Sequence, residues 1–290
     1  MDAKEDERSM THMYNMDISS PNNMFVKSTS YFLDAVAKKR DLLNYASSPD
    51  FQDSHIAKEL TVSGILIFAY LGVDPNRMVP LIDFTRQSTD FIQISRGVRH
   101  TIVTCAPIIY QSDIKGALLL KGIDDLKSPK FKLCKYPIIA SLREELENLV
   151  TDEISSNSSH EYSVLRETIH TLMHAIYGCK FYKLPVPLFR FMMKIPDEFR
   201  ELLYQRNEFS LRLLFRYASL NAISGFYFHE RRNMWKDHMI WYAQLYKLSK
   251  IDKQLYYLAV EKNFIWEDSA RFYEFDPAVE YDRLRNSQTT

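Results

Sequence analysis

Glycine is scarce in this sequence, which holds 7 glycines in 290 residues. Two-residue hairpin turns and phosphate-binding loops depend on glycine, because few other residues adopt the backbone conformations that they require. The apolar residues recur at helical rather than alternating spacing. No G-x-S-x-G, Walker or Rossmann pattern occurs. The sequence therefore predicts an all-α fold and gives no signature of a nucleotide-binding loop or a serine hydrolase.

Cysteine is also sparse. The three cysteines, Cys105, Cys134 and Cys179, are widely separated and odd in number. This usage is typical of a reducing compartment and excludes a cysteine-rich zinc module. Cys105 lies in an apolar segment, which gives no reason for a lowered thiol pKa. We therefore expect no structural disulfide and no nucleophilic cysteine.

An excess of charge of one sign is missing, because 37 lysines and arginines balance 37 aspartates and glutamates. Proteins that bind nucleic acid on their own usually carry surplus basic charge to neutralise phosphates. The charged N-terminal sequence MDAKEDERSM excludes a secretory signal, and the longest apolar run, 65–73, is too short to span a bilayer. We expect a soluble intracellular protein without a membrane span or direct nucleic-acid binding.

The chain has enough apolar residues to form a large core, since 46% of its residues are hydrophobic and 13% are aromatic. Pattern and stop signals predict one large domain of about 9 to 11 helices over residues 24–275, with a possible sub-boundary near 120–136. A disordered leader, 1–23, and a frayed tail, 276–290, flank it. The helices are expected at 24–46, 54–71, 79–104 with a break near 88–90, a short piece after Pro107, 138–151, 160–182, 186–193, 197–205, 208–228 and 233–259. Ser88 or Asp90 is the expected N-cap after that break.

Two pairs of polar residues have the spacing of metal ligands. His170 and His174 share one helical face, as in a zinc helix, but Thr171 stands where the catalytic glutamate would be and no third ligand is evident. Two half-buried histidines on an amphipathic helix are the preferred interpretation. Asp124 and Asp125 lack the further carboxylate of a magnesium-diphosphate site, because Pro129 occupies that turn. We predict no bound metal, no cofactor and no enzyme activity, with the histidine pair as the one place to look for a catalytic site.

Two stretches resemble a known family. Ser63 to Tyr70, followed by the pattern hydrophobic-x-x-x-Arg-Gly-hydrophobic at Ile92 to Val98, is similar to the regulatory region of fungal zinc-cluster transcription factors. The order Pro196-x-x-Phe199, an apolar helix ending near Tyr217, and a helix with two tryptophans resembles the same region. The sterol-uptake regulators are the branch with the greatest similarity.

This resemblance implies a helical effector domain that, in the sterol-regulating branch, binds ergosterol in an apolar pocket and controls nuclear entry and activation. Two features depart from the family. The family's DNA-binding element is a six-cysteine zinc cluster, whereas this chain has 3 cysteines and an acidic leader. The branch's glycine-rich loop is also absent after Trp241. The sequence thus predicts an effector domain without its own DNA-binding module.

Side-chain type predicts which residues face a ligand or hold helices together. The aromatic and methionine residues of the C-terminal half are usual core residues, and a pocket for an apolar ligand is the alternative. Arg96, on a mostly apolar helix, is expected to form a buried or half-buried pair that joins two helices. Gly97 is expected either to admit a neighbouring helix or to be merely tolerated. The candidate ligand-binding residues are Phe91, Ile94, Val98, Phe189, Met192, Phe215 and Trp235.

The expected partners follow from the resemblance and from composition. They are other proteins of the transcription machinery, a sterol or other apolar small molecule, and a second copy of the chain in a homodimer. The alternative is a ligand-free helical interaction or dimerisation scaffold. The resemblance implies a nuclear location, and the cytoplasm is the alternative, since no basic import run is present.

Overall fold

The fold is all-helical, as predicted. The structure is a computed structural model, and it describes residues 24–46, 48, 51–73, 79–112, 136–152, 158–183, 185–226 and 233–287. These residues form eleven α-helices and no strand. The expected leader, the sub-boundary up to residue 135 and the Asp124–Asp125 pair lie outside the described residues. The helices are α2 (Met24–Ala46), α3 (Ser54–Val73), α4 (Phe91–Ser112), α6 (Pro137–Asp152), α7 (Ser158–Tyr182), α8 (Val186–Lys194), α9 (Asp197–Tyr204), α10 (Glu208–Ile223), α11 (Met234–Leu245), α12 (Lys250–Tyr256) and α13 (Pro277–Asn286).

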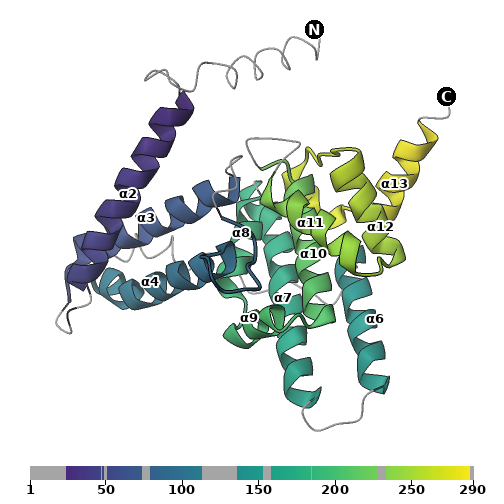
Figure 1. The fold of residues 1–290 in the computed structure, drawn as a ribbon, viewed down its shortest axis with the longest axis horizontal. Helices are drawn as coiled ribbons and strands as arrows, with labels where there is room; N and C mark the ends of the chain where they lie inside the picture. The colour runs from purple at the N-terminus through teal and green to yellow at the C-terminus, as the bar shows by residue number, and fades with distance from the viewer. Residues whose placement is uncertain are drawn as a thin grey trace.

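The helices are arranged as an N-terminal layer beside a larger body. Helices α2, α3 and α4 lie together on one side, and α6 to α13 make up the remainder (Figure 1). Within the layer α3 packs against both α2 and α4, and α4 contacts α8 of the body. A π-helical turn, η3 (Tyr257–Glu261), and a 3₁₀ segment, η4 (Ser269–Glu274), complete the C-terminal part.

Helix α10 is the central element of the body. Every residue of it except Glu208 and Arg212 is buried, which is the pattern of a helix packed on all sides. Asn207 caps its first turn by accepting a hydrogen bond from the Ser210 N–H at 2.9 Å. Its buried Arg216 is neutralised by Asp252 of α12, with 2.7 Å between Nε and Oδ1.

Trp235 of α11 joins the two parts of the fold. Its ring lies edge-on to those of Phe91, Phe189 and Tyr217, at centroid distances of 5.5, 5.8 and 5.5 Å. Its indole N–H donates a hydrogen bond to the carbonyl of Gly72 at the end of α3, at 3.1 Å. A Cβ on Gly72 would lie 2.1 Å from the Phe189 ring. Glycine at this position is therefore what lets α3 approach the aromatic core.

Several predictions about where helices begin and end are wrong, including the end of α10, which lies at Ile223 rather than at residue 228. Residues 79–90 form a loop, and α4 then runs unbroken through Pro107, so no separate helix follows that proline. The expected helix 233–259 ends at Leu245 and restarts at Lys250, because the Ser249 and Asp252 side chains form a capping box there. Residues beyond 276 form α13, where a frayed tail was expected, and Asp276 caps its start by accepting from the Ala278 N–H.

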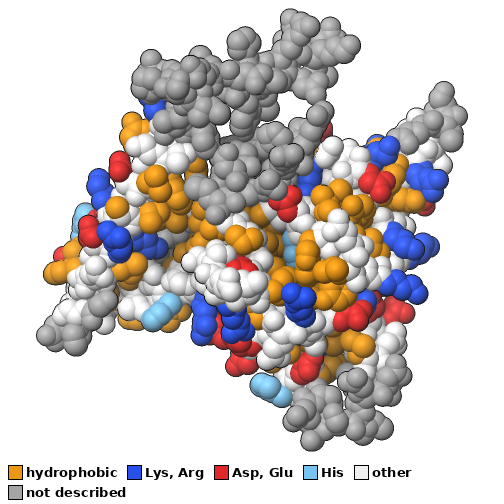
Figure 2. Space-filling model, in the orientation of Figure 1, with side chains coloured by type: hydrophobic (Ala, Val, Ile, Leu, Met, Phe, Trp, Pro, Cys, Tyr) orange, Lys and Arg blue, Asp and Glu red, His pale blue; other side chains and the backbone are white. Residues whose placement is uncertain are grey.

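Helix α3 is long and apolar enough to cross a membrane by length and composition. The expectation of no membrane span considered only the longest apolar run and missed this property. Core helices of soluble proteins pass the same test, and α3 lies between α2 and α4 with Ala57, Leu60, Phe68 and Leu71 buried. Hydrophobic side chains nevertheless show on the surface over α2 and over α11 (Figure 2).

Candidate functional site

The seven predicted ligand-binding residues lie in the packed interior. Phe91, Phe189 and Trp235 belong to one aromatic cluster, in which the Phe91 ring also stacks on Phe68 at 4.3 Å. Phe215 packs elsewhere, on Tyr242. Ile94 is half-buried, whereas Val98 and Met192 are buried with the rest. None of the seven lines either of the two pockets described below, and their assignment as ligand-binding residues stays a prediction.

The predicted burial of Arg96 is wrong, whereas one of the two alternatives for Gly97 fits the structure. The Arg96 side chain is 60% exposed, and it joins α4 to α9 through a surface ion pair, with its Nε 3.3 Å from Asp197 Oδ1. The guanidinium that is buried at this junction belongs to Arg200, which donates to the carbonyls of Met192 and Ile195 at 2.8 and 2.7 Å. Gly97 is exposed, and a Cβ there would meet nothing within 4 Å. It is the tolerated glycine of the two alternatives.

A pocket of about 420 Å³ lies between the 79–84 segment and α11, and we call it the α11 pocket. Its size falls within the range of about 300 to 1,000 Å³ that is usual for small-molecule sites. The rings of Phe84 and Trp241 stack on each other with centroids 4.8 Å apart and line one side of it. Most of its lining is apolar: it consists of Val79, Pro80, Leu81, Ile82, Phe84, Met234, Asp237, His238 and Trp241.

Asp90 holds the loop that forms one wall of this pocket. It caps α4 by accepting from the Gln93 N–H at 2.8 Å, which confirms one of the two predicted caps. It also accepts from the Asp83 N–H at 2.8 Å and from the Tyr204 hydroxyl of α9 at 2.8 Å. Burial raises the pKa of Asp90, whereas hydrogen bonds from Thr85 and Ser88 lower that of Asp83. The wall is thereby tied to both α4 and α9.

His238 is the polar residue of the pocket that sequence reasoning missed. It is 5% exposed, stacks on Trp241 at 5.4 Å, and its buried Nε2 has no hydrogen-bond partner among the described residues. Burial lowers the pKa of His238 to about 3, so the ring is neutral at pH 7. A neutral imidazole nitrogen can donate or accept one hydrogen bond, and leaving it unpaired costs about 1–3 kcal/mol. The signal for it in the sequence is its position three residues from both Trp235 and Trp241, which places it beside both aromatic residues on the helix.

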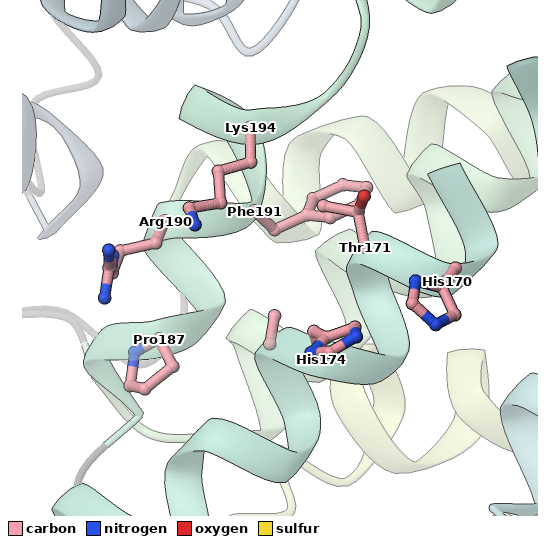
Figure 3. Close-up of a pocket in the computed structure, with 8 residues that line it drawn as sticks. His170, Thr171, His174, Pro187, Arg190, Phe191 and Lys194 are labelled. Carbon is pink, nitrogen blue, oxygen red and sulfur yellow. The ribbon is translucent and has the colours of Figure 1, made fainter. Parts of the chain in front are cut away.

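A second pocket, of about 310 Å³, lies between α7 and α8, and we call it the α7–α8 pocket (Figure 3). It contains the His170–His174 pair, whose rings lie 4.4 Å apart. Burial lowers the pKa of both histidines, and the Arg143 charge adds to this at His170 and the His170 charge at His174. In the part of the chain that the structure describes, no cluster of three or more His, Cys, Asp or Glu side chains surrounds them.

Neither of the two described cysteines has the features of a nucleophile, and Cys134 lies outside the described residues. Cys105 and Cys179 are buried, and burial raises the pKa of both thiols, that of Cys179 to about 12. This agrees with the expectation for Cys105, because a thiol rather than a thiolate is present at neutral pH. Neither cysteine lines the α11 pocket or the α7–α8 pocket.

No protein-family model matches this chain, and searches of curated proteins and of solved structures find no match either. The similarity to the fungal regulators therefore depends on the residues given above. The geometry by itself describes a helical domain with two pockets of different character, one mostly apolar and one lined by basic side chains.

Proposed function

We propose that this chain is an effector domain of the fungal transcription-regulator type, which binds an apolar small molecule in the α11 pocket and acts through contacts with other proteins. The observation that carries the proposal is the unpaired Nε2 of His238 in a mostly apolar pocket. A sterol is the leading ligand, because it combines a rigid apolar body with one hydroxyl group.

The chemistry of the pocket favours a ligand with a single polar end. The stacked rings of Phe84 and Trp241 offer flat apolar surface, and burying apolar area contributes roughly 25 cal/mol per Å². The His238 Nε2 is closed off from solvent, so the ring must shift on binding; its pairing with the hydroxyl would then remove the penalty of an unsatisfied buried nitrogen. Asp237 lines the same pocket and supplies a second polar contact at its edge.

The loop that forms the pocket wall is also part of the protein surface, so ligand binding can alter a surface that partner proteins contact. The pocket wall is fixed by Asp90, which also binds the Tyr204 hydroxyl of α9. At the surface Arg86 of this loop pairs with Glu201 of α9 at 2.8 Å. A ligand that favours one position of the loop therefore shifts the surface around α9, provided that it binds the two positions with different affinity.

The test is mass spectrometry of organic extracts from the full chain purified from a fungal host. We expect an apolar molecule, foremost a sterol, in stoichiometric amount. His238→Phe keeps a ring in place but removes the hydrogen bond, and it should weaken binding roughly threefold to tenfold. His160→Phe, at an exposed position on α7, is the matched control and should retain the ligand.

Folded protein from that host without any apolar molecule, and without binding of a fluorescent sterol added later, would refute the ligand. The alternative function, a ligand-free interaction or dimerisation scaffold, would then stand. One observation favours it: Tyr31, Leu66 and Val103 expose 73%, 63% and 63% of their surface on α2, α3 and α4. Sedimentation velocity over a range of concentrations would detect the dimer, and Leu66→Glu should abolish it if this surface is the interface.

A further inference from the structure

The α7–α8 pocket combines basic groups with an apolar wall and lies apart from the α11 pocket. Arg190 and Lys194 of α8 line it together with the histidine pair of α7, and the Arg190 side chain extends away from the histidines (Figure 3). None of the eight lining residues is acidic; they are His170, Thr171, His174, Ala175, Pro187, Arg190, Phe191 and Lys194. The lining therefore favours an anion over a cation or a metal ion.

Arg190 is the pocket residue best suited to an anionic ligand. It is half-buried on α8, yet it forms no hydrogen bond or ion pair with any described residue. Other half-buried or buried arginines of the body, such as Arg212 and Arg216, pair with carboxylates. A planar guanidinium matches a carboxylate with two parallel hydrogen bonds, so Arg190 is equipped for such a ligand.

Lys194 adds a second positive group, in surroundings that disfavour its charged form. Burial lowers its pKa, and the nearby charge of Arg99 lowers it further. Arg99 is held in place because it donates to the carbonyl of Ile195, the residue after Lys194, at 2.9 Å. An anion in the pocket would offset the repulsion between these two cations.

The remaining walls set the size and polarity of the ligand. Pro187 and Phe191 form an apolar surface next to the basic groups, and Ala175 continues it on α7. The volume of about 310 Å³ lies at the lower end for small-molecule sites. Neutral imidazoles of His170 and His174 can donate hydrogen bonds without adding charge.

We infer that the α7–α8 pocket binds a small organic carboxylate. The carboxylate lies between Arg190 and Lys194, and its apolar group packs on Phe191 and Pro187. Inorganic phosphate matches the charge but leaves the apolar wall uncovered, and a neutral molecule of the same shape leaves Arg190 unpaired. This site and the α11 pocket share no lining residue.

Isothermal titration calorimetry of the full chain tests this inference with four probes at constant ionic strength: benzoate, acetate, inorganic phosphate and benzyl alcohol. We expect benzoate to bind most tightly, acetate more weakly because it lacks an apolar group, and benzyl alcohol at least tenfold more weakly because it lacks the charge. Arg190→Gln should weaken benzoate binding at least tenfold. Arg285→Gln, which removes one exposed charge on α13, should leave it unchanged.

Three results would overturn the inference. Equal binding of benzoate and benzyl alcohol would show that charge plays no part. Tighter binding of phosphate than of benzoate would show that the ligand class is wrong. Unchanged benzoate binding by Arg190→Gln, in a variant whose circular dichroism and melting temperature match the parent, or no benzoate binding at all, would show that this pocket is not a carboxylate site.

Discussion

Substitution of Asp252 by Asn tests how the body of the fold is held together. Asp252 and Arg216 are both fully buried, and their side chains meet at 2.7 Å. Arg216 also pairs with Glu145 of α6, and Arg212 lies 3.3 Å from Glu145 and 3.8 Å from Asp252. Arg212 also pairs with Glu208 at 2.8 Å, so the network contains two arginines and three carboxylates. Asp252→Asn leaves the buried Arg216 with Glu145 as its one carboxylate partner, which it shares with Arg212.

The expected loss of stability follows from the removal of one charged partner of the buried Arg216. Removing one partner of a buried ion pair leaves an uncompensated charge and costs about 3–5 kcal/mol. Asp252 additionally accepts the backbone N–H of Ser249 at 3.2 Å in the capping box of α12. An asparagine oxygen can keep that hydrogen bond, so the loss reports mainly the charge. We expect the free energy of unfolding to fall by about 3–5 kcal/mol.

Urea unfolding followed by circular dichroism measures this loss, with the same slope in parent and variant as a check on two-state behaviour. Glu274→Gln is the matched control, because its partner Arg271 is exposed and surface pairs contribute about 0–1 kcal/mol. The double variant Arg216→Met, Asp252→Leu should recover much of the lost stability, since apolar replacements of buried pairs are often neutral. A cost below about 1 kcal/mol for Asp252→Asn would refute the assignment of this network as a buried structural element.

Two further predictions concern the core and the α11 pocket. Gly72→Ala should destabilise the fold by about 1–3 kcal/mol, because its Cβ would meet Phe189 at 2.1 Å. Gly97→Ala is the control, and it should stabilise the fold by up to about 1 kcal/mol. If thermal unfolding shows the same change in stability for both variants, the close packing at Gly72 is contradicted. The pKa of His238 is lowered from 6.5 to about 3, so its stabilising contribution is complete above pH 6.5 and declines as pH falls toward 3. Relative to His238→Phe, the parent should lose roughly 2–3 kcal/mol between pH 7 and 4.5, and parallel pH profiles from urea unfolding would contradict the burial of this ring.

Helix positions were largely readable from the sequence because their ends carry local signals. Helix α2 has the predicted bounds, and Asp90 is the cap that begins α4. The sequence wrongly predicts a helix over residues 79–90, because the apolar residues of this loop have helix-like spacing. These apolar residues instead lie in a loop whose conformation is fixed by contacts between residues far apart in the sequence. Examples are the hydrogen bond from the Phe91 N–H to the Pro80 carbonyl and the one from the Tyr204 hydroxyl to Asp90. Local pattern does not encode such contacts.

The pocket residues were less predictable for a related reason. Large aromatic residues form both cores and ligand sites, and only the tertiary arrangement decides which. Trp235 and Trp241 lie on the same helix, yet Trp235 is enclosed by Phe91, Phe189 and Tyr217, whereas Trp241 lines the α11 pocket. No property of either tryptophan in the sequence distinguishes them.

Among the described residues, an unsatisfied polar group marks a candidate ligand site only where it also lines a pocket. In the aromatic cluster around Trp235 the indole N–H binds the Gly72 carbonyl. The buried Tyr217 hydroxyl of that cluster has no hydrogen-bond partner in the described part of the chain, but Tyr217 lines neither pocket. His238 lies one helical turn further along with a buried nitrogen that is unpaired, and Arg190 carries a charge that no described carboxylate balances. Native proteins pair nearly all buried polar groups, and His238 is the one described residue with a buried unpaired atom that lines either of the two pockets. Arg190 is half-buried and lines the other pocket, so these two residues are where we propose that other molecules bind.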